Sequence, residues 1–229
     1  MAYLAPPSCR LRRLGLCVVA VALVALSVSG CVRLLEPRTS DATYYLLSPP
    51  QDEASLPSDT TGLAVGLRAP RMASYLAATR LVTRRGPHQI RFSEFHRWAE
   101  DLDQGISRTL AQTLAAQDSI RSVEVVPWPK GTTFDYIVQL HVLRFEGVGP
   151  RPDPETDEDS PPPEGHSLMV VEWKILDAKD DTVLERGLTR HRTDGWSVGN
   201  YETLASRLGT GLATLADDIG AQLKSLARP

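Results

Sequence analysis

The chain has few cysteines for its 229 residues: only three are present. Two of them, Cys9 and Cys17, lie within the first thirty residues, which we expect to be removed from the mature protein. The mature chain would then keep Cys31 alone and could form no internal disulfide. A role for the Cys31 thiol would therefore have to be something other than an internal disulfide.

The sequence also lacks an apolar run long enough to span a bilayer. The segment Leu14–Val28 falls short of the roughly 20 residues that a spanning helix needs. It follows Arg10, Arg12 and Arg13 and precedes small residues, which is the order of a secretory signal covering residues 1–30. Val28-Ser29-Gly30-Cys31 resembles the lipobox of bacterial lipoproteins, which implies a covalent lipid on Cys31. An ordinary thiol beside an ordinary cleavage site is the alternative.

An excess of positive charge is missing as well. The net charge of −3 becomes −6 once residues 1–30, with three arginines and no acids, are removed. This balance argues against a nucleic-acid partner. We expect residues 31–41, which contain Pro37, to be a flexible tether behind the lipidated cysteine, and residues 42–229 to form one domain.

Signatures of catalysis and of cofactor binding are not found. The sequence contains no G-x-S-x-G, no G-x-x-x-x-G-K-S/T and no G-x-G-x-x-G motif. The histidines are scattered singly, without the spacing of a zinc site; they are His88, His96, His141, His166 and His191. We therefore predict no catalytic residues, no metal and no cofactor other than the lipid. A Ser-His-Asp set from distant positions stays open, and with it a lipid-anchored hydrolase.

Segments rich in β-branched and aromatic residues predict a sheet. Gly86-Pro87 marks a hairpin between two of the segments, and residues 136–142 alternate between apolar and polar side chains. The expected strands are Ala42–Leu47, Gly62–Leu67, Arg80–Arg84, Gln89–Phe92, Ser122–Val126, Phe134–Phe145, Ser167–Leu176 and Val183–Thr193.

Two segments have the apolar spacing of amphipathic helices. The first is Arg97–Ala116, in which Trp98 would begin the buried stripe and Arg97 would pair with Glu100 on the surface. The second begins after the cap Asn200 and ends near Leu226, and its glycines at 209 and 211 would permit close packing against the sheet or a partner helix. The order of elements predicts an α+β two-layer sandwich, with a mostly antiparallel sheet and both long helices on one face.

The segment Gly149–Gly165 is rich in acids and prolines and cannot form a core. We interpret it as a solvated hairpin loop between the two longest strands. A tail that binds a cation or a basic partner is the alternative, although the segment lacks the spacing of an EF-hand.

Several segments together resemble a known family. They are the lipobox at Cys31, Tyr44-Tyr45-Leu46-Leu47, Val65-Gly66 leading to Pro70 and Tyr75-Leu76, Val82-x-Arg84, and Phe95-His96-Arg97-Trp98-Ala99-Glu100. On these residues the chain resembles the ABC-type transport auxiliary lipoproteins, which include the paraquat-inducible protein C lipoproteins of Gram-negative bacteria.

This resemblance implies a non-enzymatic periplasmic component that docks an MCE-domain protein and works with an ABC-type or related inner-membrane transporter in moving lipid between membranes. Val32 after the cysteine suggests sorting to the outer membrane, with the inner membrane as the alternative, and the resemblance is compatible with a homo-oligomer. A direct lipid carrier is a second hypothesis. The residues expected to contact the partner are Tyr75, Arg84, Arg97, Trp98 and Glu100.

Overall fold

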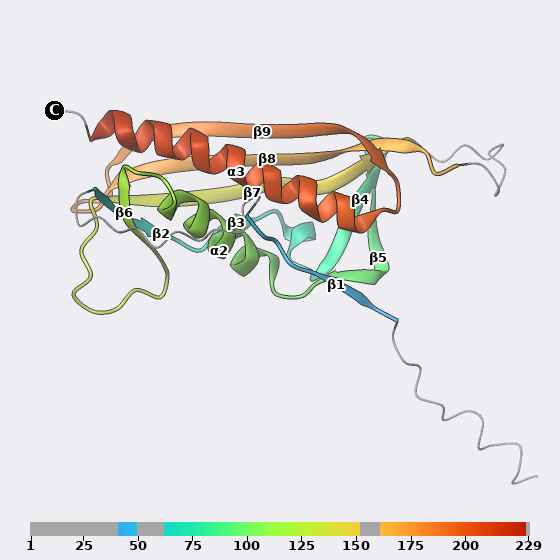
Figure 1. The fold of residues 1–229 in the computed structure, drawn as a ribbon, viewed down its shortest axis with the longest axis horizontal. Helices are drawn as coiled ribbons and strands as arrows, with labels where there is room; N and C mark the ends of the chain where they lie inside the picture. The colour runs from blue at the N-terminus through green and yellow to red at the C-terminus, as the bar shows by residue number, and fades with distance from the viewer. Residues whose placement is uncertain (1–40, 50–61, 152–160, 228–229) are drawn as a thin grey trace, which may run out of the picture. The chain divides into compact units, whose positions relative to one another are not determined.

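The computed structural model describes residues 41–49, 62–151 and 161–227 (Figure 1). The signal segment, Cys31, the tether to residue 40 and the acidic residues 153–159 lie outside the described residues, so the predictions made for them are untested. The strands are β1 (Thr43–Tyr45), β2 (Leu63–Leu67), β3 (Arg71–Met72), β4 (Arg80–Arg85), β5 (Gln89–Trp98), β6 (Ile120–Val125), β7 (Tyr136–Gly149), β8 (Glu164–Asp177) and β9 (Val183–Ser197). The helices are α2 (Leu102–Ala115), α3 (Tyr201–Leu226) and the short 3₁₀ helix η2 (Ser74–Leu76).

The sheet is mixed and is organised around β7. One edge of β7 pairs in parallel with β2, β3 and β4 in succession, and the other edge pairs antiparallel with β8, which in turn pairs with β9. β4 continues antiparallel to β5, and β1 adds in parallel to β5 at one end of the sheet. The three longest strands, β7, β8 and β9, are thus joined by antiparallel pairing, as expected for an α+β fold.

Both helices pack on the same face of the sheet. α3 contacts β7, β8 and β9, and α2 contacts α3 and β6. Figure 1 shows α3 running across the long strands with α2 beside it. The predicted stripes lie in the core with 5% or less exposed; their members include Leu102, Ile106, Leu110 and Leu114 of α2 and Leu204, Leu208, Leu212, Leu215, Ile219 and Leu223 of α3. The two-layer sandwich predicted from the sequence is confirmed.

Two glycines let tryptophans cover the sheet. A Cβ on Gly187 would lie 2.0 Å from the ring of Trp173 on the neighbouring strand, and one on Gly147 would lie 2.6 Å from the ring of Trp196. The side chain of Thr189 joins this layer to α3, because its hydroxyl accepts a hydrogen bond from Trp173 Nε1 (3.1 Å) and donates one to Asp218 (2.5 Å). Any side chain larger than hydrogen at these glycines would displace a buried ring.

The beginning of the first helix differs from the prediction. Residues Phe95–Trp98 extend β5, because its last three residues pair with β1 and Arg97 also pairs with Arg80 of β4. The helix α2 begins only at Leu102. Trp98 is buried, but it belongs to the strand. The expected pair between Arg97 and Glu100 is therefore wrong: Glu100 instead forms an ion pair with Arg108.

The last helix agrees with the sequence prediction. α3 begins at Tyr201, and the side chain of Asn200 accepts a hydrogen bond from the backbone N–H of Thr203 (3.0 Å). Gly211 lies against Met169 and His191, which confirms close packing against the sheet. β8 and β9 both extend beyond their expected bounds, and β3 and η2 were not predicted.

Candidate docking site

The five residues expected to contact a partner fall into two groups. Tyr75 and Arg84 lie together on the side of β7 that faces away from the helices. Arg97, Trp98 and Glu100 lie at the corner where β1, β5 and α2 meet. The family motif is thus divided between two places in the fold.

The first group is completed by Glu146 of β7, whose side chain is fully buried. Its carboxylate accepts hydrogen bonds from Arg84 Nε (2.7 Å) and from Arg144 Nε (2.8 Å). The hydrogen bond to Glu146 raises the pKa of Arg84. One buried carboxylate therefore fixes two guanidinium groups, and the cluster carries a net positive charge.

Tyr75 closes one side of this cluster. The guanidinium carbon of Arg84 lies 5.9 Å from the centroid of the Tyr75 ring. The Tyr75 hydroxyl donates a hydrogen bond to the backbone oxygen of Leu143 (3.1 Å). Burial, followed by the charge of Glu146, raises the pKa of Tyr75 to about 12. The hydroxyl is neutral at physiological pH and acts as a fixed donor.

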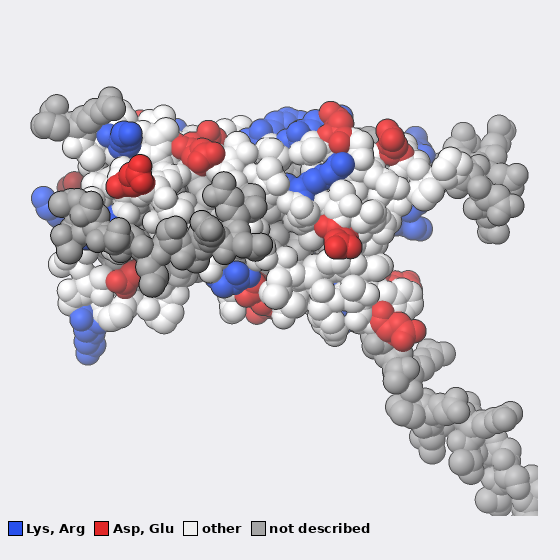
Figure 2. Space-filling model, viewed as in Figure 1, with Lys and Arg blue, Asp and Glu red and all other residues white. Residues whose placement is uncertain are grey.

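The cluster continues across the sheet into β8 and β9. Arg144 pairs across the sheet with Val170, which pairs with Arg190; Glu146 pairs with Leu168, which pairs with Arg192. Thr189 and His191 bond to α3, so the alternating Arg190 and Arg192 point to the helix-free face, where both residues are exposed. We call Arg84, Arg144, Arg190 and Arg192 the basic face. Arg192 also forms an ion pair with Asp194 of the same strand (2.6 Å). Figure 2 shows the helix-bearing side, on which acidic and basic side chains are interspersed.

The second group mainly supports the fold. Trp98 is 4% exposed and packs against Phe145, with ring centroids 6.0 Å apart. Arg108, which pairs with Glu100, also donates to the backbone oxygen of Leu47 (2.9 Å). Together these contacts fasten the chain after β1 to the first turns of α2.

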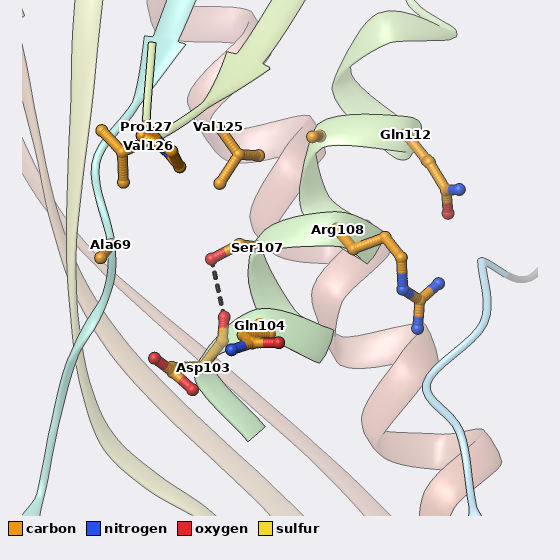
Figure 3. Close-up of a pocket in the computed structure, with 10 residues that line it drawn as sticks. Ala69, Asp103, Gln104, Ser107, Arg108, Gln112, Val125, Val126 and Pro127 are labelled. Atoms are coloured by element: carbon orange, nitrogen blue, oxygen red, sulfur yellow. Dashed lines mark hydrogen bonds between the residues drawn. The ribbon is translucent and has the colours of Figure 1, made fainter. Parts of the chain in front are cut away.

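An open groove of about 560 Å³ runs beside α2 (Figure 3). Ser107 faces Val125 across it, and the Ser107 hydroxyl donates to the backbone oxygen of Asp103 (2.7 Å). Arg108 points away from this wall, toward the segment that follows β1. The lining residues are Ala69, Asp103, Gln104, Ser107, Arg108, Ala111, Gln112, Val125, Val126 and Pro127.

The histidines lie apart from one another. The ring of His96 hydrogen-bonds Tyr45 and stacks on Tyr201, that of His141 contacts Glu172, and that of His191 contacts Thr193 and Thr214. In the described residues, no group of three or more His, Cys, Asp or Glu side chains is placed to hold a metal ion. None of the helices in the same residues is long and apolar enough to cross a membrane.

The sequence of the described domain matches a known protein family. The model of the ABC-type transport auxiliary lipoprotein component matches residues 45–220. The chain belongs to this family. The family resemblance predicted from the sequence is thereby confirmed, whereas the lipobox at Cys31 lies outside the matched residues. No curated protein sequence matches the chain.

Solved structures are similar in fold to this auxiliary lipoprotein. A crystal structure of a Xanthomonas campestris protein of the DUF330 family matches 81% of this chain and 100% of its own, at 16% identity and a TM-score of 0.59. A crystal structure of an uncharacterised protein matches 79% of this chain and 97% of its own, at 18% identity and a TM-score of 0.58. The PelC dodecamer from Paraburkholderia phytofirmans matches 70% of this chain and 91% of its own, at 16% identity and a TM-score of 0.38.

Two residues of the basic cluster were missed by sequence reasoning. Glu146 and Arg144 lie within or beside a run that was predicted only as a strand. The usable signal was the pair of charges two residues apart inside a strand, since a buried charge needs a partner. The partner, Arg84, lies 62 residues away along the chain.

Proposed function

We propose that this auxiliary lipoprotein is a non-catalytic docking component, held at a membrane by lipid on Cys31, that binds an MCE-domain protein of an ABC-type intermembrane lipid transport system. The observation that carries the proposal is the family match over residues 45–220. The outer membrane is the proposed location, on the ground of Val32 after the lipidated cysteine.

The basic face is the proposed contact with the transport partner. Arg84 and Arg144 are held in place by Glu146, so little side-chain entropy is lost when they bind a carboxylate. The exposed side chain of Leu188 on β9 adds apolar surface beside Arg190. Arginine beside apolar surface is typical of protein interfaces, and the complementary partner surface would present acidic side chains.

Of the residues predicted to bind the partner, Tyr75 and Arg84 lie at the basic face. Arg97 lies at the β1 corner, Glu100 is held by Arg108, and Trp98 is buried. We therefore propose direct contact for Tyr75 and Arg84, and a supporting role for Trp98 and Glu100 through the strand and helix that they join.

A direct lipid carrier is the second candidate function. Fully buried apolar side chains from both layers, among them Leu140, Val171 and Leu212, fill the space between the sheet and the helices in the described residues. This filled core favours docking over carrying, because a carrier needs room for an acyl chain. Native mass spectrometry of the gently purified protein separates the two: bound phospholipid would favour the carrier.

A pull-down tests the docking proposal. The lipidated protein, solubilised from membranes in mild detergent, is expected to recover an MCE-domain protein. The variant Arg190→Gln, an exposed change on the basic face, should recover less of it, whereas Lys130→Gln, an exposed change on a loop outside β7, should recover as much as the parent protein. If the parent protein recovers no MCE-domain protein, the proposal is wrong.

The lipid anchor has its own test. Cys31→Ser should leave the domain folded but release it from membranes into the soluble fraction. If the variant stays with membranes after a high-salt wash, the lipid on Cys31 is not the anchor.

A further inference from the structure

Exposed apolar side chains gather at one corner of the molecule. Five large hydrophobic residues are exposed in the described part of the chain, and three of them lie on or beside β1 and β5. These three are Tyr44, Leu46 and Phe95, with 60%, 58% and 55% of their surface exposed. With the neighbouring Arg97 they form what we call the β1 patch. A cluster of this kind on a soluble surface marks an interaction site.

The strand pairing shows why these side chains share one face. Tyr45 pairs with Trp98, and both pack into or against the core. Tyr44 pairs with Arg97, one position earlier on each strand, so both side chains point to the opposite face. Leu46, which follows the end of β1, and Phe95 of β5 each lie two residues from one member of this pair, and both are exposed beside it.

Positive charge accompanies the apolar side chains. Arg97 also pairs with Arg80 of β4, so a row of Tyr44, Arg97 and Arg80 crosses three strands. Arg97 Nε is buried and has no hydrogen-bond partner among the described residues. In those residues no acidic side chain forms an ion pair with Arg97 or Arg80. The patch thus combines exposed apolar rings with uncompensated guanidinium charge.

The chain enters the described structure at this patch. Tyr44 follows Cys31 by only 13 residues, a stretch that spans at most about 45 Å when fully extended. A lipid on Cys31 would keep the patch within that distance of the bilayer. A tether of this length gives the patch a high effective concentration at the membrane surface.

We propose that the β1 patch lies against the bilayer in which the lipid on Cys31 is anchored, with Tyr44, Leu46 and Phe95 in the interfacial layer and Arg97 at the lipid phosphates. Tyrosine is enriched at this depth in membrane proteins, and guanidinium groups bind phosphate in a bidentate manner. The proposal rests on the lipid anchor of the proposed function and adds a second membrane contact, which fixes how the domain is turned relative to the membrane.

The test places a fluorescent reporter at single positions of the lipidated protein. Phe95→Cys and Leu46→Cys introduce a thiol for an environment-sensitive nitrobenzoxadiazole label. Leu188→Cys is the matched control, since Leu188 is 60% exposed on β9, at the other end of the sheet order. Each labelled protein is reconstituted on phosphatidylethanolamine and phosphatidylglycerol vesicles, with and without doxyl-labelled lipid, after its thermal unfolding has been compared with that of the parent.

The expected result is a blue shift and doxyl quenching at positions 46 and 95 and neither at 188. If the protein floats with vesicles but all three labels remain unquenched, the patch proposal is wrong while the anchor stands. If the protein does not float with vesicles, the anchor itself fails. If the labels at 46 and 95 are shielded in detergent alone and the shielding grows with protein concentration, a second copy covers the patch, which also overturns the proposal.

Discussion

The carboxylate of Glu146 on β7 lies 2.7 Å from Nε of Arg84 on β4, and the side chain of Glu146 has no exposed surface. Arg144 binds the same oxygen from a position two residues away on β7. A buried carboxylate is costly to remove from water unless its charge is matched, and here two guanidinium groups match it. This relationship fixes the positions of Arg84 and Arg144 within the basic face.

Glu146→Gln should therefore destabilise the protein. The change leaves two guanidinium groups without their counter-charge. Because both groups are partly exposed to water, we expect the free energy of unfolding to fall by only about 2–3 kcal/mol. Glu172→Gln is the control, because Glu172 is exposed on β8 and pairs only with His141 at the surface; its cost should be within about 0.5 kcal/mol. Urea unfolding of both variants measures the difference, and equal costs would contradict this account of the cluster.

The raised pKa of Tyr75 predicts a loss of stability in strong alkali. Burial and Glu146 raise this pKa to about 12, whereas a tyrosine in the unfolded chain titrates near its ordinary value of 10.0. The folded state thus keeps a proton that the unfolded state loses. The stability that the neutral Tyr75 hydroxyl gives the folded state is therefore fully present below pH 10 and is lost as the pH rises through about 12.

Tyr75→Phe tests this sign. Between pH 9 and 12, the free energy of unfolding should fall more steeply with pH for the parent protein than for the variant. Ultraviolet absorbance should show the parent's last tyrosinate step disappear in the variant. Parallel pH profiles for the two proteins would mean that Tyr75 titrates normally.

Gly187→Ala should damage the sheet layer beneath α3. A methyl group there would lie 2.0 Å from the Trp173 ring, which also donates to Thr189, so the ring must move and its hydrogen bond weaken. We expect a cost of about 1–3 kcal/mol, against less than about 0.5 kcal/mol for the exposed Arg186→Ala next to it. A thermal melt in which the two variants unfold at the same temperature would rule out the close packing of Trp173 on Gly187.

Arg108→Met should loosen the segment after β1 while leaving α2 formed. Arg108 donates to the backbone oxygen of Leu47, and the amide of Ala99 donates to Tyr45 (2.8 Å) in the same corner. We expect faster hydrogen exchange at Ala99 in the variant and unchanged exchange in α3. Arg121→Met on β6 is the control. Slow exchange at Ala99 in both variants would show that Arg108 does not hold this corner.

Long-range contacts explain which parts of the fold the sequence could not predict. Asn200 and the leucine stripe after it define α3 locally, and the predicted cap at Asn200 and end near Leu226 agree with the structure. The segment Phe95–Trp98 continues the helical spacing of the α2 stripe toward the N-terminus, yet it is a strand because β1, fifty residues earlier, pairs with it. Pairing at that distance has no local signature, so tertiary contacts override the pattern.

The same reason applies to the candidate site. Tyr75 and Arg84 could be selected by family resemblance, but the buried Glu146 that orients Arg84 lies 62 residues away. Their convergence depends on the parallel pairing of β4 with the end of β7. A one-residue shift in that register would turn Arg84 toward the helices.

The most direct test of the docking account is photo-cross-linking in intact cells. A photoreactive amino acid replaces Arg190 on the basic face in one strain and Asp217, exposed on α3, in another. The account predicts a cross-link to an MCE-domain protein from position 190 and none from position 217. Cross-links to that protein from position 217 alone, or from neither position, would contradict it.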